Sequence, residues 1–190
     1  IEIRKTLDGR ECDLIESHHS NQKLLVVSDP FTHKAMGSRI FKNLKAKINV
    51  DEYIWEQPSS SIEGVQFLRT KLKDYDGMIA VGSGTVSDSI KYATFLEDKV
   101  YSVFATTPMN AYTTGTASIS FDGIKKSLVA HYAQGVFFDL EVLSNCPKRL
   151  TAAAFADVIC RTTAQVDWLM SHKLLNTDYK TTPYELLALY

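Results

Sequence analysis

The stretch that decides the fold is residues 77–90, GMIAVGSGTVSDSI. It opens with a short apolar run bounded by glycines, which is typical of a buried strand. Val86, Ile90 and Ala93 then recur near helical spacing, so Gly82-Ser83-Gly84-Thr85 is expected to form a tight turn between a strand and a helix. Glycines in such a turn let the backbone approach a ligand closely, and the helix N-terminus offers unpaired N–H groups to an anion such as a diphosphate.

Two interpretations of this turn stay open at this point. It is either a phosphate-binding turn or an ordinary helix cap with nothing bound, because Ser or Thr commonly caps a helix N-terminus. The turn is not a complete G-x-G-x-x-G motif, and it is not a Walker loop, which requires Gly-Lys followed by Ser or Thr.

The alternation of strand and helix continues on both sides of the turn. Apolar runs predict strands, and apolar residues at helical spacing predict helices. Further strands are expected over 23–29, 51–56 and 100–105, with helices over 31–47 and around 65–72. This order predicts an α/β fold with a parallel sheet and helices on both faces.

Asp29 follows the first of these strands, at its carboxyl end. In open α/β sheets that end faces the ligand crevice, where an acid can accept hydrogen bonds from a ribose and would repel a 2′-phosphate. The alternative is that Asp29 caps a helix that begins near Pro30, since Pro is frequent at the first helical position. The two roles are compatible.

A hydroxyl-rich segment, residues 106–118, follows the strand over 100–105. Many hydroxyls and few charges after the carboxyl end of a strand suit a polar ligand, although a plain surface loop has the same composition. Short strands are expected over 119–121 and 135–139, with a hairpin around the solvated pair Lys125-Lys126.

The composition changes at Pro147, after which apolar residues at helical spacing predict a long helix. Asp157 lies on the apolar side of this helix, where an ionised carboxylate needs either a partner or a metal. Arg161, four residues later, is the simpler partner. Residues 183–190 predict the start of another helix, and the chain begins without Met, so we expect further sequence at both ends.

The overall composition is that of a globular protein, with 45% hydrophobic and 23% charged residues. The net charge of −1 gives no indication of nucleic acid or an anionic membrane surface, and no apolar run approaches a membrane span. Cys12, Cys146 and Cys160 lack C-x-x-C spacing, which argues against a disulfide framework and favours a cytoplasmic protein. The pair His18-His19 is expected to be exposed, and His131 structural or exposed.

Four segments together resemble the sn-glycerol-1-phosphate dehydrogenase family, which belongs to the superfamily of iron-containing alcohol dehydrogenases, glycerol dehydrogenases and dehydroquinate synthases. They are Gly82-Ser83-Gly84-Thr85-Val86-Ser87-Asp88, Ala105-Thr106-Thr107-Pro108-Met109-Asn110-Ala111-Tyr112-Thr113, Ala154-Phe155-Ala156-Asp157 and Asp167-Trp168. The resemblance runs from about residue 20 to the end of the chain. It implies a nucleotide-binding α/β domain over 1–146, followed over 147–190 by the first part of an all-helical domain, as in dehydroquinate synthases.

The resemblance also implies roles for individual residues. Gly82, Ser83, Gly84 and Thr85 would hold the cofactor diphosphate, Thr106 and Thr114 would contact the cofactor, Asn110 would contact the substrate, and Asp157 would be the catalytic metal ligand. Relatives have one more residue, a serine, between Pro108 and Met109. They also complete the metal site with two histidines that would lie beyond Tyr190.

The implied reaction is hydride transfer between a nicotinamide cofactor and a polyol phosphate such as sn-glycerol 1-phosphate, assisted by one divalent metal, zinc or iron. Asp29 favours NAD, although NADP is possible. The alternatives are a lyase of the dehydroquinate synthase type and a nucleotide-binding module without turnover. We expect these 190 residues alone to be inactive. We expect the protein to bind no nucleic acid, and a homo-oligomer is compatible with the sequence.

Overall fold

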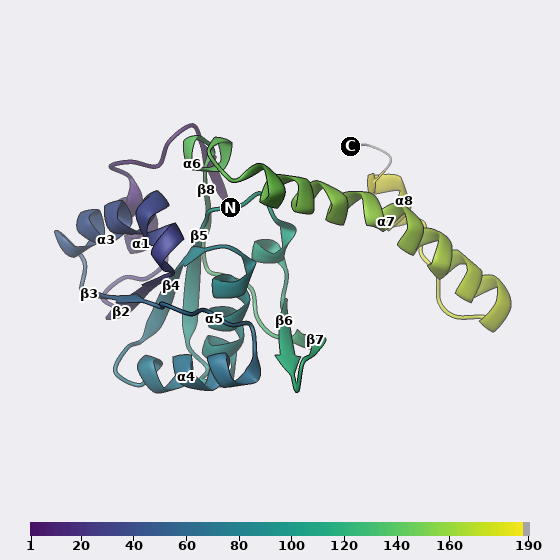
Figure 1. Cartoon of the computed structure of the whole chain (residues 1–190), viewed down its shortest axis with the longest axis horizontal. Coiled ribbons are helices and arrows are strands. Elements are labelled where there is room, and N and C mark those ends of the chain that lie inside the picture. Colours follow the sequence, from purple (N-terminus) through teal and green to yellow (C-terminus); the bar gives the residue numbers. More distant parts are fainter. Residues whose placement is uncertain (188–190) are drawn as a thin grey trace. The chain divides into compact units, whose positions relative to one another are not determined.

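The computed structural model describes residues 1–187 (Figure 1). The chain divides into two compact units, Ile1–Pro147 and Lys148–Tyr190, and each is described by itself. None of the helices within residues 1–187 combines the length and the hydropathy that a bilayer-spanning helix requires.

The first unit is built on a six-stranded parallel sheet, which confirms the predicted α/β fold. From one edge to the other the strands are β1 (Glu2–Arg4), β8 (Val136–Asp139), β5 (Val100–Ala105), β4 (Gly77–Gly82), β2 (Leu24–Ser28) and β3 (Val50–Ile54). The helical segments of this unit are α1 (Glu11–Glu16), α2 (Pro30–Thr32), the π-helical η1 (His33–Gly37), α3 (Ser38–Lys45), α4 (Ile62–Leu72), α5 (Gly84–Leu96), the 3₁₀-helical η2 (Asn110–Thr113) and α6 (Leu140–Ser144).

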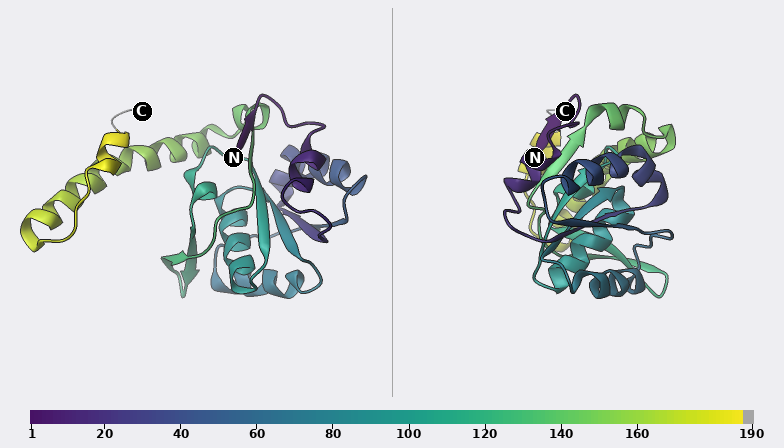
Figure 2. Two further views of the ribbon diagram at one scale, coloured as in Figure 1. Left: turned by 180° about the vertical axis from the view of Figure 1, so that it is seen from behind. Right: turned by 90° about the vertical axis from the view of Figure 1, so that its left-hand side faces the viewer.

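Both faces of the central strands are buried, because side chains alternate from one face to the other along each strand. In β4, Met78 and Ala80 belong to the core beneath α4 and α5, whereas Ile79 and Val81 belong to the core beneath α1 and α3. Figure 2 shows the helices on the two sides of the sheet. This double burial explains the uninterrupted apolar run that predicted the strand.

The order of the strands reverses between β2 and β4. From β2 the chain adds β3 on one side, and it then adds β4, β5 and β8 on the other side. In open parallel sheets, ligands bind outside the carboxyl ends of the strands at the point where the order reverses. Asp29 and Ser83 directly follow the carboxyl ends of β2 and β4, so the fold places both at this point.

The hairpin lies at a different position from the one predicted. β6 (Thr116–Phe121) and β7 (Ile124–Val129) pair antiparallel as a separate two-stranded sheet. Their turn is Asp122-Gly123, with φ of 49° and 79°, a conformation in which Asp-Gly is strongly preferred. The pair Lys125-Lys126 is exposed on β7, after the turn, and Val136–Asp139 joins the main sheet instead.

His19 is buried, so the expectation that both neighbouring histidines are exposed is wrong for this one. Its Nε2 lies 2.6 Å from Oγ of Ser102, and its Nδ1 lies 2.9 Å from Oε1 of Gln22. An amide oxygen can only accept, so the neutral imidazole carries its proton on Nδ1 and accepts from Ser102. Burial lowers the pKa of His19 below its usual value of 6.5.

Acidification from about pH 7.5 to about pH 5.5 is expected to destabilise the protein through His19. Because the pKa is lowered only in the folded state, the unfolded chain binds a proton there that the folded chain does not. This contribution to stability is therefore complete above pH 6.5 and is lost as the pH falls below it. Urea denaturation at several pH values should show a smaller loss on acidification for His19→Gln than for the unaltered protein.

The exposed neighbour His18 provides the matched control for this measurement. His18 makes only the smallest of the contributions to the lowered pKa of His19, so His18→Gln should keep most of the pH dependence of the unaltered protein. If His18→Gln and His19→Gln changed the pH dependence equally, the buried imidazole would not be its cause.

The second unit consists of α7 (Lys148–Leu175) and α8 (Thr182–Leu187). After α7 the chain folds back on the helix, where Nε1 of Trp168 donates to the carbonyl oxygen of Asp178 at 2.6 Å. Nδ1 of His172 lies 2.6 Å from the carbonyl oxygen of Thr177. The long helix was predicted from the sequence, and the predicted helix over 183–190 is described as far as Leu187; residues 188–190 lie outside the described part.

Candidate functional site

The register of the sheet brings three of the predicted site segments to one edge. Ser28 of β2 pairs with Val81 of β4, and Gly82 pairs with Ala105 of β5. Since each strand ends near these pairs, the residues that follow them, Asp29, Ser83 and Thr106, lie along the same carboxyl edge. The strand order reverses here, so this edge is the candidate site.

The turn after β4 is open at its second glycine. A Cβ atom at Gly84 would lie 3.7 Å from Sδ of Met109, an ordinary contact, whereas a Cβ atom at Gly82 would lie only 2.8 Å from Cβ of Val86. Gly82 therefore lets the strand pack closely on α5, and Gly84 leaves space above the turn. The side chain of Ser83 makes no capping hydrogen bond, although Ser83 is the N-cap of α5. The turn thus differs from an ordinary Ser-capped helix start.

Thr106 brings a buried hydroxyl to this edge. The residue is 6% exposed, and within residues 1–187 its Oγ1 has no hydrogen-bond partner. Leaving a buried polar group unsatisfied costs about 1–3 kcal/mol, so such groups usually meet a ligand or ordered water. The backbone N–H of Thr106 donates to the carbonyl oxygen of Gly82 at 3.3 Å, which fixes Thr106 beside the turn.

Tyr112 fastens the hydroxyl-rich loop to the turn, a role that sequence reasoning missed. Its hydroxyl donates to the carbonyl oxygen of Gly82 at 3.0 Å and lies 2.6 Å from Oγ1 of Thr107. Burial raises the pKa of Tyr112 to about 12, so the phenol stays neutral and remains a donor. The signal in the sequence was a single large aromatic residue within a segment of small polar residues.

Lys91 and Asp88 form a buried ion pair under the same loop, also missed from the sequence. Nζ of the fully buried Lys91 lies 3.4 Å from Oδ1 of Asp88, and it donates to the carbonyl oxygens of Ala111 at 2.6 Å and Thr116 at 2.9 Å. Burial lowers the pKa of Lys91 and raises the pKa of Asp88. Oδ2 of Asp88 accepts from the N–H of Ser118 at 3.2 Å. The pair therefore holds η2 and the start of β6 against α5.

Thr114 and Asn110 lie on this loop in different settings. The Thr114 hydroxyl donates to the carbonyl oxygens of Ala111 and Thr116, and Nζ of Lys91 lies 3.4 Å from it. Thr114 thus serves the loop itself, and its contact with a cofactor stays a prediction. Asn110 begins η2 and is exposed, so it is accessible to a ligand from solution.

Asp29 caps α2, as one of the two interpretations predicted. Its Oδ1 accepts from the backbone N–H groups of Phe31 and Thr32 at 2.9 Å, and the Thr32 hydroxyl accepts from the N–H of Asp29 at 3.0 Å. This reciprocal capping box fixes the carboxylate at the carboxyl end of β2. The cap does not exclude the ribose contact, which stays a prediction.

Asp157 lies in the second unit, on α7. Its Oδ2 accepts from Nη2 of Arg161 at 3.2 Å, the pairing that sequence spacing offered as the simpler partner. The Asp157 side chain is partly exposed and paired with Arg161, so its carboxylate does not require a metal ion to offset the cost of burial. Among residues 1–187 no three His, Cys, Asp or Glu side chains are grouped so as to hold a metal ion.

Comparison with known sequences identifies relatives of the chain. Residues 2–147 match the sequence profile of a family described as iron-containing alcohol dehydrogenase. A glycerol-1-phosphate dehydrogenase [NAD(P)+] from Pyrococcus horikoshii is 33% identical over 153 residues, which cover 79% of this chain and 44% of that protein. An enzyme of the same name from Geobacillus thermodenitrificans is 28% identical over 173 residues, which cover 87% and 43%. The chain thus spans less than half the length of these curated relatives.

Solved structures show the same fold. An iron-containing alcohol dehydrogenase from Thermotoga maritima aligns with a TM-score of 0.69 and 17% identity, covering 82% of this chain and 49% of that one. A glycerol dehydrogenase from Schizosaccharomyces pombe aligns with a TM-score of 0.67 and 19% identity, covering 76% and 38%. At these identities the likeness speaks for the fold alone.

Proposed function

Because the chain belongs to the iron-containing alcohol dehydrogenase family, we propose that it is the nucleotide-binding part of an NAD(P)-dependent dehydrogenase acting on a polyol phosphate. The observation that carries the proposal is the buried hydroxyl of Thr106, which has no hydrogen-bond partner among residues 1–187 and lies beside the open turn at Gly84. The two relatives named above are glycerol-1-phosphate dehydrogenases, which supports sn-glycerol 1-phosphate as the leading substrate.

The residues of this chain bind and orient the cofactor. The backbone N–H groups at the start of α5 bind the diphosphate, because a helix N-terminus attracts anions and Gly84 leaves it accessible. The Thr106 hydroxyl completes its hydrogen bonding on the cofactor, and Asn110 contacts the substrate from the loop. When bound, the nicotinamide supplies the hydride chemistry, while the protein supplies position and electrostatics.

A complete metal site does not fit the described residues, since no group of three suitable side chains lies among residues 1–187. By family resemblance, Asp157 is one ligand of a zinc or iron centre, and metal centres of this kind need at least two further protein ligands.

Calorimetric titration of the purified chain with NAD and with NADP tests the proposal directly. We expect saturable binding of at least one of them, and absence of binding to both would overturn the proposal. Assaying the same chain with dihydroxyacetone phosphate and NADH separates the alternatives. Binding without oxidation of NADH is the result expected for a nucleotide-binding module, and it would leave the polyol phosphate to be tested on a longer protein.

The charge of Asp29 is expected to select against NADP. Asp29→Asn keeps an oxygen that can cap α2 and removes the negative charge next to the expected ribose site. We expect the affinity for NADP to rise about three- to tenfold relative to that for NAD, in line with about 1 kcal/mol for one partly screened charge. The measurement is a titration of both proteins with both cofactors. An unchanged ratio of the two affinities would exclude Asp29 from cofactor choice.

A further inference from the structure

A polar pocket lies at the opposite edge of the sheet from the candidate site. The loop between α1 and β2 and the loop between α3 and β3 border a volume of about 450 Å³. Both loops lead into the amino ends of parallel strands, because Leu24 of β2 pairs with Val50 of β3. The pocket is therefore separate from the carboxyl edge, where Asp29, Ser83 and Thr106 lie. Its volume falls within the range of small-molecule pockets, roughly 300–1,000 Å³.

The lining of this pocket is mainly polar. Three carboxamides and a hydroxyl line it together with one carboxylate and one ammonium group, from Asn21, Gln22, Asn49, Ser20, Glu16 and Lys47. The side chain of Ile48 contributes an apolar part of the wall. A carboxamide both donates and accepts hydrogen bonds, so the three amides suit a neutral polar group of a ligand.

The two charged side chains of the lining lie near each other without pairing. Burial raises the pKa of the Cys12 thiol, the positive charge of Lys47 opposes that rise, and the negative charge of Glu16 adds to it. Both charges therefore lie close to the same thiol. Within residues 1–187, the side chains of Glu16 and Lys47 form no ion pair and no hydrogen bond. Opposite charges that face one pocket and stay unpaired are complementary to a ligand that carries both charges, a zwitterion.

The wall of the pocket beside Gln22 is held in place by the buried His19. This imidazole is 2% exposed, and its two nitrogens contact Ser102 on β5 and Oε1 of Gln22. Because the amide oxygen of Gln22 accepts from His19, its NH₂ group is the part that can serve a ligand, and it has no partner in the part of the chain that the structure describes, 1–187. The neighbouring Asn21 adopts a left-handed backbone with φ of 59°, which Asn tolerates better than most residues.

We propose that this pocket binds a free α-amino acid with a neutral polar side chain. The ammonium group of Lys47 binds the ligand's carboxylate, and the carboxylate of Glu16 binds its ammonium group. The amides of Asn21, Gln22 and Asn49 hydrogen-bond its side chain. A neutral polyol would leave both protein charges without a counter-charge, and a simple anion would be repelled by Glu16. The inference does not depend on the proposed function, because the pocket and the cofactor turn lie at opposite edges of the sheet.

Calorimetric titration of the whole chain at low salt with L-glutamine and two derivatives tests the two charges separately. N-acetyl-L-glutamine keeps the carboxylate and lacks the positive charge, whereas L-glutaminamide keeps the ammonium group and lacks the negative charge. We expect L-glutamine to bind about two- to fivefold more tightly than either derivative, the order of one exposed ion pair. Lys47→Gln should weaken L-glutamine and its N-acetyl derivative by that factor and should not weaken L-glutaminamide. Glu16→Gln should weaken L-glutamine and L-glutaminamide and should not weaken the N-acetyl derivative.

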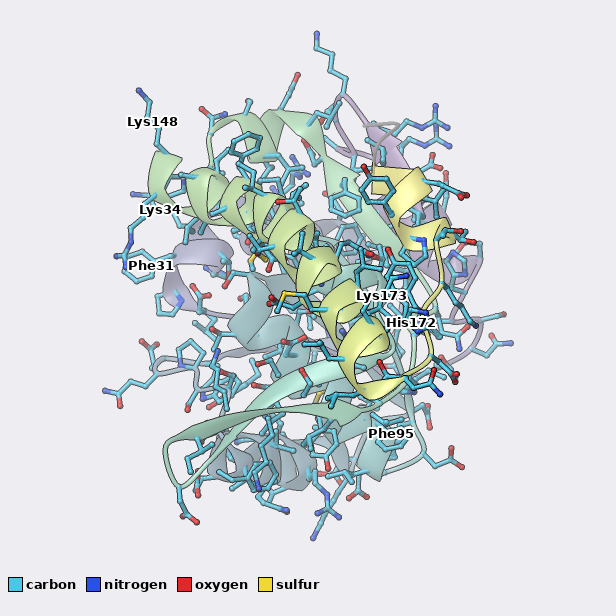
Figure 3. The ribbon with its side chains drawn as sticks, turned by 90° about the vertical axis from the view of Figure 1, so that its right-hand side faces the viewer. Phe31, Lys34, Phe95, Lys148, His172 and Lys173 are labelled. Atoms are coloured by element: carbon cyan, nitrogen blue, oxygen red, sulfur yellow. The ribbon has the colours of Figure 1, made fainter. Side chains whose placement is uncertain are left out.

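Two exposed charged residues near the carboxyl edge provide matched controls. Lys34 projects away from its helical segment η1 (Figure 3), and Glu56 is exposed after β3. Lys34→Gln and Glu56→Gln remove the same charges and should leave all three affinities unchanged. Absence of L-glutamine binding to the unaltered chain would overturn the proposal. Equal affinities for L-glutamine and its N-acetyl derivative would show a plain anion site and overturn it too, as would equal effects of Lys47→Gln and Lys34→Gln.

Discussion

A chain that carries Gly84→Val is expected to fold normally and to bind NAD(P) roughly 10- to 100-fold more weakly. A β-branched side chain at this position fills the space above the turn, and the diphosphate can then no longer approach the N–H groups at the start of α5. Steric misfits of this kind cost about 1–3 kcal/mol, which corresponds to that loss of affinity. The fold should tolerate the change because an added Cβ meets only the side chain of Met109, with Sδ at 3.7 Å and Cε at 4.0 Å.

Calorimetry gives the affinity, and thermal unfolding followed by circular dichroism gives the stability. Gly82→Ala is the informative control, since its Cβ would come within 2.8 Å of Cβ of Val86 and should lower the stability. Gly84→Val is therefore expected to weaken binding of the cofactor, whereas Gly82→Ala is expected to lower the stability of the fold. A folded Gly84→Val protein that binds NAD and NADP as tightly as the unaltered protein would refute the diphosphate site.

The sheet and the turn could be predicted because their signals are local. The run over 24–28 is apolar because both faces of the strand are covered, and Gly82-Ser83-Gly84-Thr85 interrupts the next strand at the point where α5 begins. The hairpin was misplaced for a related reason. Asp122-Gly123 is a strong turn signal, but the prediction placed the turn at the neighbouring pair Lys125-Lys126 instead.

The polar interior could not be predicted because its partners are distant in sequence. His19 can be buried because its Nε2 has a partner in Ser102 on β5, which is distant in sequence. A pair of adjacent histidines in the sequence does not reveal that partner. Tyr112 reaches Gly82 in the same way. Lys91 lies on α5, and its acceptors are carbonyl groups of Ala111 and Thr116, which only the folded chain brings near.

For the candidate site, the structure adds a physical reason for some of the predicted residues and not for others. Thr106 was assigned by family resemblance, and the structure adds a physical reason for a ligand there, a buried hydroxyl without a partner among residues 1–187. The structure gives Thr114 a role within the loop, and it gives Asp157 an ion pair with Arg161. For these two residues the cofactor and metal roles still rest on the resemblance alone.

Replacing Lys91 by Met is expected to destabilise the protein by about 3–5 kcal/mol, because removing one partner leaves the other charge buried and unpaired. The change also removes the donor from the carbonyl oxygens of Ala111 and Thr116, so the loop that carries Asn110 loses its attachment to α5. Urea denaturation measures the loss of stability. Affinity for NAD(P) should fall as well, since the loop borders the turn.

The pH dependence of this variant distinguishes a lost ion pair from lost packing. Burial raises the pKa of Asp88 in the folded state, and the Lys91 charge opposes that rise. Without the lysine, the folded chain binds a proton at Asp88 that the unfolded chain releases, so the stability of Lys91→Met relative to the unaltered protein should rise as the pH falls from about 7 toward about 5. The double variant Asp88→Asn, Lys91→Met has no carboxylate at position 88 to protonate, so its stability relative to the unaltered protein should not rise in this way. Parallel pH profiles for the single and double variants would mean that Lys91 acts through its packing and not through its charge.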